Sequence, residues 1–141
     1  MQTFLPYPCF YKTAKVLDYR RLGKQRLEAK IIYDTLTADW RKPKRGLGNH
    51  PAVLMWKGYE ICLLNYCQIM INEWVNRGYK NTMEIPMVHI AHINNPPWLG
   101  NYDFHLSHQS NLLRKDQEYY GSIFGKVPND LPYIWPTKIT I

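Results

Sequence analysis

The stretch Arg21–Ala29, with the sequence RLGKQRLEA, places a single carboxylate, Glu28, among three cations and a glycine. Nearby positive charge keeps a carboxylate ionised, and an ionised carboxylate can stabilise a developing cation or move a proton. The cations themselves suit the phosphates of a polyanion. The stretch therefore indicates either an ordinary charged helix surface or an acid positioned for chemistry on nucleic acid.

The positive charge of the chain is concentrated in one segment. Between Lys12 and Arg45 there are eleven Lys and Arg against four Asp and Glu, whereas the other residues have seven of each, so the net charge of +7 belongs to this segment. Localised positive charge is typical of a nucleic-acid-binding face, because bound cations release the counterions of the phosphates. A solvated basic surface and a surface for an acidic protein partner are the alternatives.

The N-terminus supplies a possible nucleophile. An α-amine has an ordinary pKa of about 7.7–8.0, against about 10.4 for lysine, so much more of it is unprotonated near neutral pH. In a cleft, such an amine can attack a carbon centre and form a Schiff base. Because Gln2 is large, we expect the initiator methionine to be kept and the amine to be that of Met1. The alternative is a frayed terminus without a role.

Three helices are expected to position these groups. The first covers 18–37, with Asp18 as its N-cap and an apolar stripe along one face. The second covers 51–77 and begins with a proline after His50, the expected cap. The third covers about 107–120. The pattern predicts a mostly α fold of about three helices joined by long irregular loops, including a basic loop over 39–49 and a proline-rich strap at the end of the chain.

Composition limits the class of protein. With 141 residues, 45% of them apolar, the chain predicts one compact domain over 1–141. The sequence has neither a long apolar run nor a signal-peptide pattern, so we expect a cytoplasmic monomer that does not meet a membrane. Three cysteines without a C-x-x-C pair argue against a disulfide framework, and we expect Cys62 and Cys67 to be core thiols.

Other motifs were weighed as metal, cofactor or base-binding sites. Two His-x-x-His pairs occur, at His89/His92 and His105/His108, but no cysteine is close to either, so no metal is expected; His108 is instead expected to contact a phosphate. The sequence contains no glycine-rich phosphate loop, and no cofactor is predicted. The aromatic residues Trp98, Tyr133 and Trp135 are expected to clamp loops to the core, with stacking on exposed bases as the alternative.

Taken in order, these features resemble the pyrimidine-dimer DNA glycosylases of the phage endonuclease V type. The segments that carry the resemblance are LGKQRLEA on the first helix, the stretch from HPAVLMW to NRGY, and LLRKDQEYYGSIFGK. In more detail, MQTFLPY, LGKQR, NHPAVLMW and SHQSNLLRKD resemble a branch of small uncharacterised proteins classed with these enzymes. The resemblance covers most of the chain and implies an endonuclease V-like, mostly α fold.

The resemblance also implies a function and a set of site residues. It implies a DNA glycosylase, with or without lyase activity, that acts on a damaged or modified base in double-stranded DNA through the Met1 amine and Glu28. The residues expected to contact nucleic acid are Arg20, Arg21, Lys24, Gln25, Arg26, His50, His108, Arg114 and Lys115. A non-catalytic nucleic-acid-binding protein with the same basic groove is the alternative function.

Two departures from the family pattern bear on this expectation. The family's glutamate directly follows an arginine, whereas here Leu27 stands between Arg26 and Glu28. One residue along a helix rotates a side chain by about 100°, so Glu28 reaches the amine only if the helix is rotated or offset. The family also exposes its nucleophile by removing methionine before a small residue, and Gln2 is not small.

Overall fold

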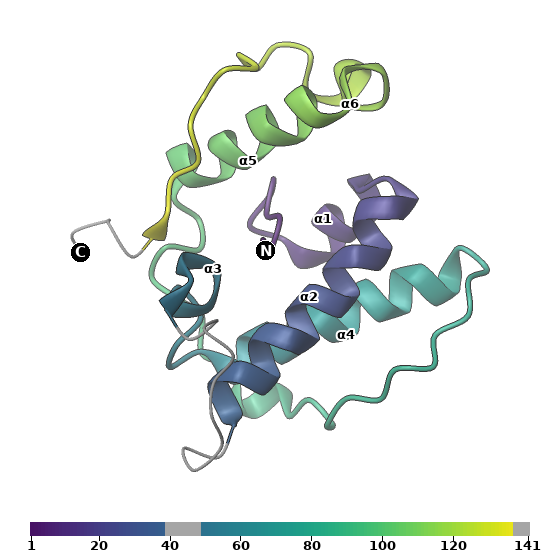
Figure 1. The fold of residues 1–141 in the computed structure, drawn as a ribbon, viewed down its shortest axis with the longest axis vertical. Helices are drawn as coiled ribbons and strands as arrows, with labels where there is room; N and C mark the ends of the chain where they lie inside the picture. The colour runs from purple at the N-terminus through teal and green to yellow at the C-terminus, as the bar shows by residue number, and fades with distance from the viewer. Residues whose placement is uncertain (39–48, 137–141) are drawn as a thin grey trace.

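The computed structural model describes residues 1–38 and 49–136, and these residues form helices and irregular segments without strands (Figure 1). In chain order the helices are α1 (Phe10–Val16), α2 (Tyr19–Thr37), α3 (Pro51–Leu54), α4 (Glu60–Asn76), the 3-10 turn η2 (Ile90–His92), α5 (Tyr102–Lys115) and α6 (Gln117–Phe124). The mostly α prediction is confirmed. Among the described helices, none combines the length and apolar character needed to cross a membrane.

The pair α2 and α4 forms the main helix packing of the molecule. Leu22, Ala29 and Ile32 of α2 are fully buried, and α4 is buried along most of its length. Gly23 is required where Trp74 of α4 crosses α2, because a Cβ at this glycine would lie 2.8 Å from a carbon of the Trp74 ring. The sequence pattern of α2 therefore fixes both its buried face and its close approach to α4.

A second layer, α5 and α6, lies across the N-terminal segment (residues 1–6) from α2 and α4 (Figure 1). From α6, residues 125–136, here called the C-terminal strap, run back along α5. Side chains of α5 hold this strap: Ser110 Oγ accepts a hydrogen bond from Leu131 N at 3.0 Å, and Arg114 donates to Asn129 O at 2.6 Å. The strap is thus irregular in backbone but tied to a helix.

Two predicted caps are confirmed. The Asp18 side chain accepts a hydrogen bond from Arg21 N and begins α2, and its backbone N–H donates to the Tyr120 hydroxyl at 3.0 Å. His50 Nδ1 accepts from Ala52 N at 3.0 Å and begins α3. Both caps satisfy backbone N–H groups that have no partner within the helix.

The predicted number and bounds of the helices need correction. The single helix expected over 51–77 is two helices, because the chain turns at Gly58, whose φ is +89°. The third helix begins earlier than expected, at Tyr102, and is interrupted at Asp116, whose extended backbone ends α5 and whose side chain caps α6. Helix α1 was not expected, and most of the predicted basic loop, residues 39–48, lies outside the described residues.

The expected core residues are found in the core. Cys62 and Cys67 are free thiols with no exposed surface, and burial raises their pKa values to about 11 and about 12. Trp98 is also buried, with its indole N–H donating to Met55 O at 3.0 Å, so it packs against the core and does not offer a face to bases.

Candidate functional site

The N-terminal segment lies inside the molecule and is held there by side chains. Phe4 N donates to Gln25 Oε1 at 2.7 Å, and the Tyr66 hydroxyl lies 2.7 Å from Phe4 O and 2.9 Å from the same Gln25 oxygen. Trp56 of the α3–α4 turn donates its indole N–H to Thr3 Oγ at 3.0 Å. Buried backbone polar groups need partners, and here helices far along the chain provide them. The start of the chain is therefore fixed in one position.

Two buried histidines complete this anchorage. His108 Nδ1 accepts a hydrogen bond from Leu5 N at 2.9 Å, and His105 Nδ1 lies 2.8 Å from Leu5 O. Because His105 Nε2 accepts from Gly100 N, the Nδ1 of His105 carries the proton and donates to Leu5 O. Burial lowers the pKa of both rings, that of His108 to about 3. Both are neutral structural groups at physiological pH.

His108 should make the stability of the protein sensitive to acid. Its pKa is about 3 in the native state and about 6.5 when unfolded, so the unfolded chain binds a proton first as pH falls. The stabilisation is complete above pH 6.5 and declines between pH 6.5 and 3, by at most about 1.4 kcal/mol per pH unit. Denaturant unfolding at pH 7.5, 6.0 and 5.0 measures this slope.

Two variants of this residue separate the proton from the hydrogen bond. His108→Asn keeps an acceptor for Leu5 N and should give a flatter pH dependence than the wild-type chain. His108→Leu removes the acceptor and should lose about 1–3 kcal/mol of unfolding free energy at pH 7.5. Equal pH slopes for the wild-type chain and His108→Asn would contradict the assignment.

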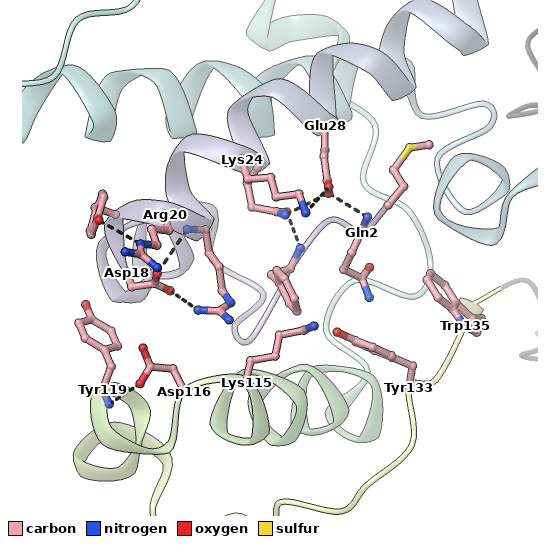
Figure 2. A pocket seen from close by; sticks show the side chains of 15 residues that line it. Gln2, Asp18, Arg20, Lys24, Glu28, Lys115, Asp116, Tyr119, Tyr133 and Trp135 are labelled. Carbon is pink, nitrogen blue, oxygen red and sulfur yellow. Dashed lines mark hydrogen bonds and ion pairs between the residues drawn. The ribbon is translucent and has the colours of Figure 1, made fainter.

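Glu28 lies directly beside the start of the chain. Its Oε2 accepts a hydrogen bond from Gln2 N at 2.9 Å and a longer one, at 3.3 Å, from Gln25 Nε2 (Figure 2). Backbone geometry limits the span from one backbone nitrogen to the next to about 3.7 Å, so the Met1 nitrogen lies no more than about 6.6 Å from Glu28 Oε2. Within the described residues, the Met1 amine and the Glu28 carboxylate do not form a direct ion pair. A reacting carbon would therefore find both groups within reach.

Glu28, and not Leu27, lies on the face of α2 that meets the start of the chain. The residue that directly follows Arg26 is Leu27, which is 47% exposed and lies outside the pocket. Glu28, Gln25 and Lys24 are on the side of α2 that meets the chain start. The helix thus presents the acid one step later than the family pattern, and the acid faces the N-terminal segment.

An open pocket of about 770 Å³ surrounds this pair of groups (Figure 2). Helix α2 forms one wall, the α5–α6 junction forms the opposite wall, and the first residues of the chain lie between them. Two aromatic residues of the C-terminal strap, Tyr133 and Trp135, close one end. Segments from both ends of the chain therefore meet around Glu28.

Four of the cations predicted to bind nucleic acid line this pocket. Arg20 and Lys24 on α2 and Lys115 on α5 are exposed to solvent, and Lys24 Nζ lies 3.7 Å from Glu28 Oε1. Arg21 is partly buried, with one guanidinium nitrogen 3.2 Å from Asp18 Oδ1. Cations on two facing walls suit the phosphates on either side of a bound nucleotide.

Three other predicted contacts have structural roles outside the pocket lining. Arg26 donates to the Asn81 side chain, and its guanidinium carbon lies 5.0 Å from the centre of the Trp74 ring. Arg114 is tied to the C-terminal strap, and His50 caps α3 with its ring perpendicular to that of Trp135. These groups support the walls of the pocket.

Two residues predicted to contact nucleic acid, His108 and Gln25, are each 1% exposed. His108 Nδ1 and the Gln25 carboxamide are engaged by the N-terminal segment and Glu28. Gln25 has a different importance, since its carboxamide joins Phe4 N to the Glu28 carboxylate.

Neither His-x-x-His pair forms a described metal centre. Within residues 1–38 and 49–136, no group of three or more His, Cys, Asp or Glu side chains is placed to hold a metal ion. The rings of His89 and His92 lie 5.8 Å apart near η2, and His105 and His108 bind the backbone of Leu5.

The comparison with protein families agrees with this architecture. Residues 1–87 match the family model described as pyrimidine dimer DNA glycosylase. The chain belongs to this family. The matched residues include the N-terminal segment, Glu28 and the helices α1 to α4. Neither a curated protein nor a solved structure gave a significant match.

The pocket of this family member contains residues that the sequence did not reveal. They are Gln2, Phe4, Asp18, Tyr19, Asp116 and Tyr119. Asp18 was recognised only as a helix cap, and its proximity to the cation-rich stretch was the available signal. Nothing local to Asp116 or Tyr119 indicates that the α5–α6 junction faces α2, because that arrangement depends on tertiary packing.

Proposed function

We propose that the protein is a DNA glycosylase with an associated lyase step, acting as a single domain on a damaged or modified base in double-stranded DNA. The observation that supports this most is the contact of Glu28 with Gln2 N, which holds the acid beside the start of the chain in a pocket lined by cations. Membership of the pyrimidine dimer DNA glycosylase family supports DNA as the substrate.

The proposed reaction begins at the Met1 amine. The unprotonated nitrogen attacks C1′ of the sugar, a C–N bond forms, and the glycosidic bond breaks with its electron pair leaving on the base. Glu28 stabilises the cationic sugar while the base departs, and its carboxylate accepts a proton from the attached nitrogen. Glu28 then gives this proton to the ring oxygen O4′ as the C1′–O4′ bond breaks, which forms a protonated imine and restores the carboxylate. The released base takes its proton from water.

The lyase step uses the same acid. Glu28 removes a proton from C2′ of the imine, the C3′–O bond breaks, and the phosphate leaves with the electron pair. Water then hydrolyses the imine and returns the free amine. The hydrogen bonds from Gln2 N and Gln25 Nε2 keep the carboxylate in place for both transfers.

The cations of the pocket have a separate role. Arg20, Lys24 and Lys115 would contact the phosphates that flank the reacting sugar, and these contacts would offset the energy needed to move a nucleotide out of the duplex. The interaction should weaken as salt increases, since each neutralised phosphate releases counterions.

Trapping with borohydride tests this function. The wild-type chain is incubated with three duplexes that share one sequence, one undamaged, one with a thymine dimer and one with an abasic site, and sodium borohydride is added. Reduction of the imine should leave a covalent protein–DNA adduct on the abasic duplex, and an adduct on the dimer duplex would identify the lesion. Salt-sensitive binding without any adduct would favour the alternative, a non-catalytic nucleic-acid-binding protein.

A further inference from the structure

The two ends of the pocket differ in chemistry. At one end Tyr133 and Trp135 stand beside Gln2, whereas Arg20 and Tyr119 occupy the other end (Figure 2). Glu28 and the start of the chain lie between these ends. A ligand with an aromatic part and an anionic part on either side of a reacting carbon would match this sequence of groups.

The aromatic end is rigidly built. Tyr133 packs at a tilt against the Phe4 ring, with centroids 6.4 Å apart, and edge-on against His108 at 5.6 Å. The Trp135 ring follows at 5.7 Å from Tyr133, and its centroid lies 6.1 Å from that of the His50 ring. Ile134 stands between these two aromatic residues in the sequence, and its backbone N–H donates a hydrogen bond to Ser107 Oγ at 3.3 Å. Both rings are only partly buried, so they offer surface to a ligand without first having to be ordered.

The size of the pocket limits what can enter. About 770 Å³ is within the range of pockets that take a single small ligand, and a nucleotide must leave the base stack to reach such a site. Aromatic side chains bind the π-face of any base, whereas cations bind phosphate. A nucleotide in this pocket would therefore be oriented with its base at the aromatic end and its phosphates toward the cations.

We propose that an extrahelical nucleotide binds with its base stacked on Tyr133 and Trp135, its C1′ opposite Glu28, and its phosphates toward Arg20 and Lys115. This inference rests on the proposed function and adds the residues that select the base. Both aromatic residues lie in the C-terminal strap, outside residues 1–87 that match the family model. The recognition of the base is thus contributed by a part of the chain beyond the family match.

The test measures binding, not cleavage, with two probes. One is a duplex with a single bulged thymine, which leaves the stack readily, and the other carries a tetrahydrofuran abasic analogue at the same position. Trp135→Ala should weaken binding of the thymine probe by roughly 5- to 100-fold and leave binding of the abasic probe nearly unchanged. Trp135→Phe keeps a ring and should recover most of the loss, and Tyr133→Leu should behave like Trp135→Ala.

The abasic probe is also the control for folding, because a misfolded variant would lose both affinities. Lys115→Ala is the matched contrast, and it should weaken binding of both probes to a similar degree. Equal weakening of both probes by Trp135→Ala, or no change with either, would overturn the proposal, as would a wild-type chain that binds neither probe. If the wild-type chain forms no borohydride adduct but Trp135→Ala weakens binding of the thymine probe alone, the result would refute the proposed chemistry and support the stacking site.

Discussion

Replacing Glu28 with glutamine is expected to slow release of the lesion base and strand cleavage at an abasic site by about 10²- to 10⁴-fold, the usual contribution of a positioned acid–base group. Glutamine keeps the length of the side chain and an oxygen that can accept the hydrogen bond from Gln2 N, now 2.9 Å from Glu28 Oε2. The variant loses the negative charge and the ability to accept the C2′ proton. The fold and the position of the chain start should therefore be retained while the chemistry is lost.

Asp34→Asn is the matched control for this variant. Asp34 lies on the same helix, α2, and pairs with Lys30 four residues away, as Glu28 pairs with Lys24, but it does not line the pocket. Its loss removes the same charge and should leave base release and strand cleavage unchanged. Single-turnover base release from the lesion duplex and strand cleavage of the abasic duplex, with thermal unfolding of each variant, make the comparison. Unchanged rates of both steps in Glu28→Gln would rule out the proposed role of this acid.

Extending the chain by Gly-Ser ahead of Met1 should reduce adduct formation by more than about 100-fold, because the nitrogen of Met1 becomes an amide and an amide is not a nucleophile. Met1 lines the pocket and is partly exposed, so the extension can pass into open space without unfolding the buried residues behind it. The same extension placed after Ile141 is the control. Binding to the abasic duplex should change by only a few-fold in both chains.

The competing nucleophile is Lys24, whose Nζ lies 3.7 Å from Glu28 Oε1. Digestion of the trapped adduct and mass mapping of the modified peptide distinguish the two amines. An adduct on the peptide that begins at Met1 supports the proposal. Full trapping by the extended chain, with the adduct on the peptide that contains Lys24, would transfer the reaction to the lysine.

Local sequence signals predicted α2 well. The Asp18 cap and the apolar stripe placed this helix correctly. Within the described residues, the errors in the number and bounds of the helices occurred where the backbone conformation of a single residue ends a helix. Gly58 and Asp116 each interrupt a helical pattern, and a glycine or an aspartate within such a pattern does not by itself reveal a turn.

The far wall of the pocket depends on tertiary structure. Lys115 and Tyr133 meet Glu28 across long separations in sequence, and no local pattern sets such a meeting. The contact of His108 with the N-terminal segment has the same origin, because its partner, Leu5 N, is 103 residues away. A histidine near the start of a polar-looking helix resembles a phosphate contact until its burial is known.

The anchorage of residues 2–5 also has a consequence for biosynthesis. These residues are synthesised well before their partners, since Leu5 is held by His105 and His108, which are 100 and 103 positions later. Contacts between such distant positions form late, because a long loop must close first. The basic helix α2 can be made long before α5 exists. The anchorage of residues 2–5 beside Glu28 would therefore be completed only after α5 has been made.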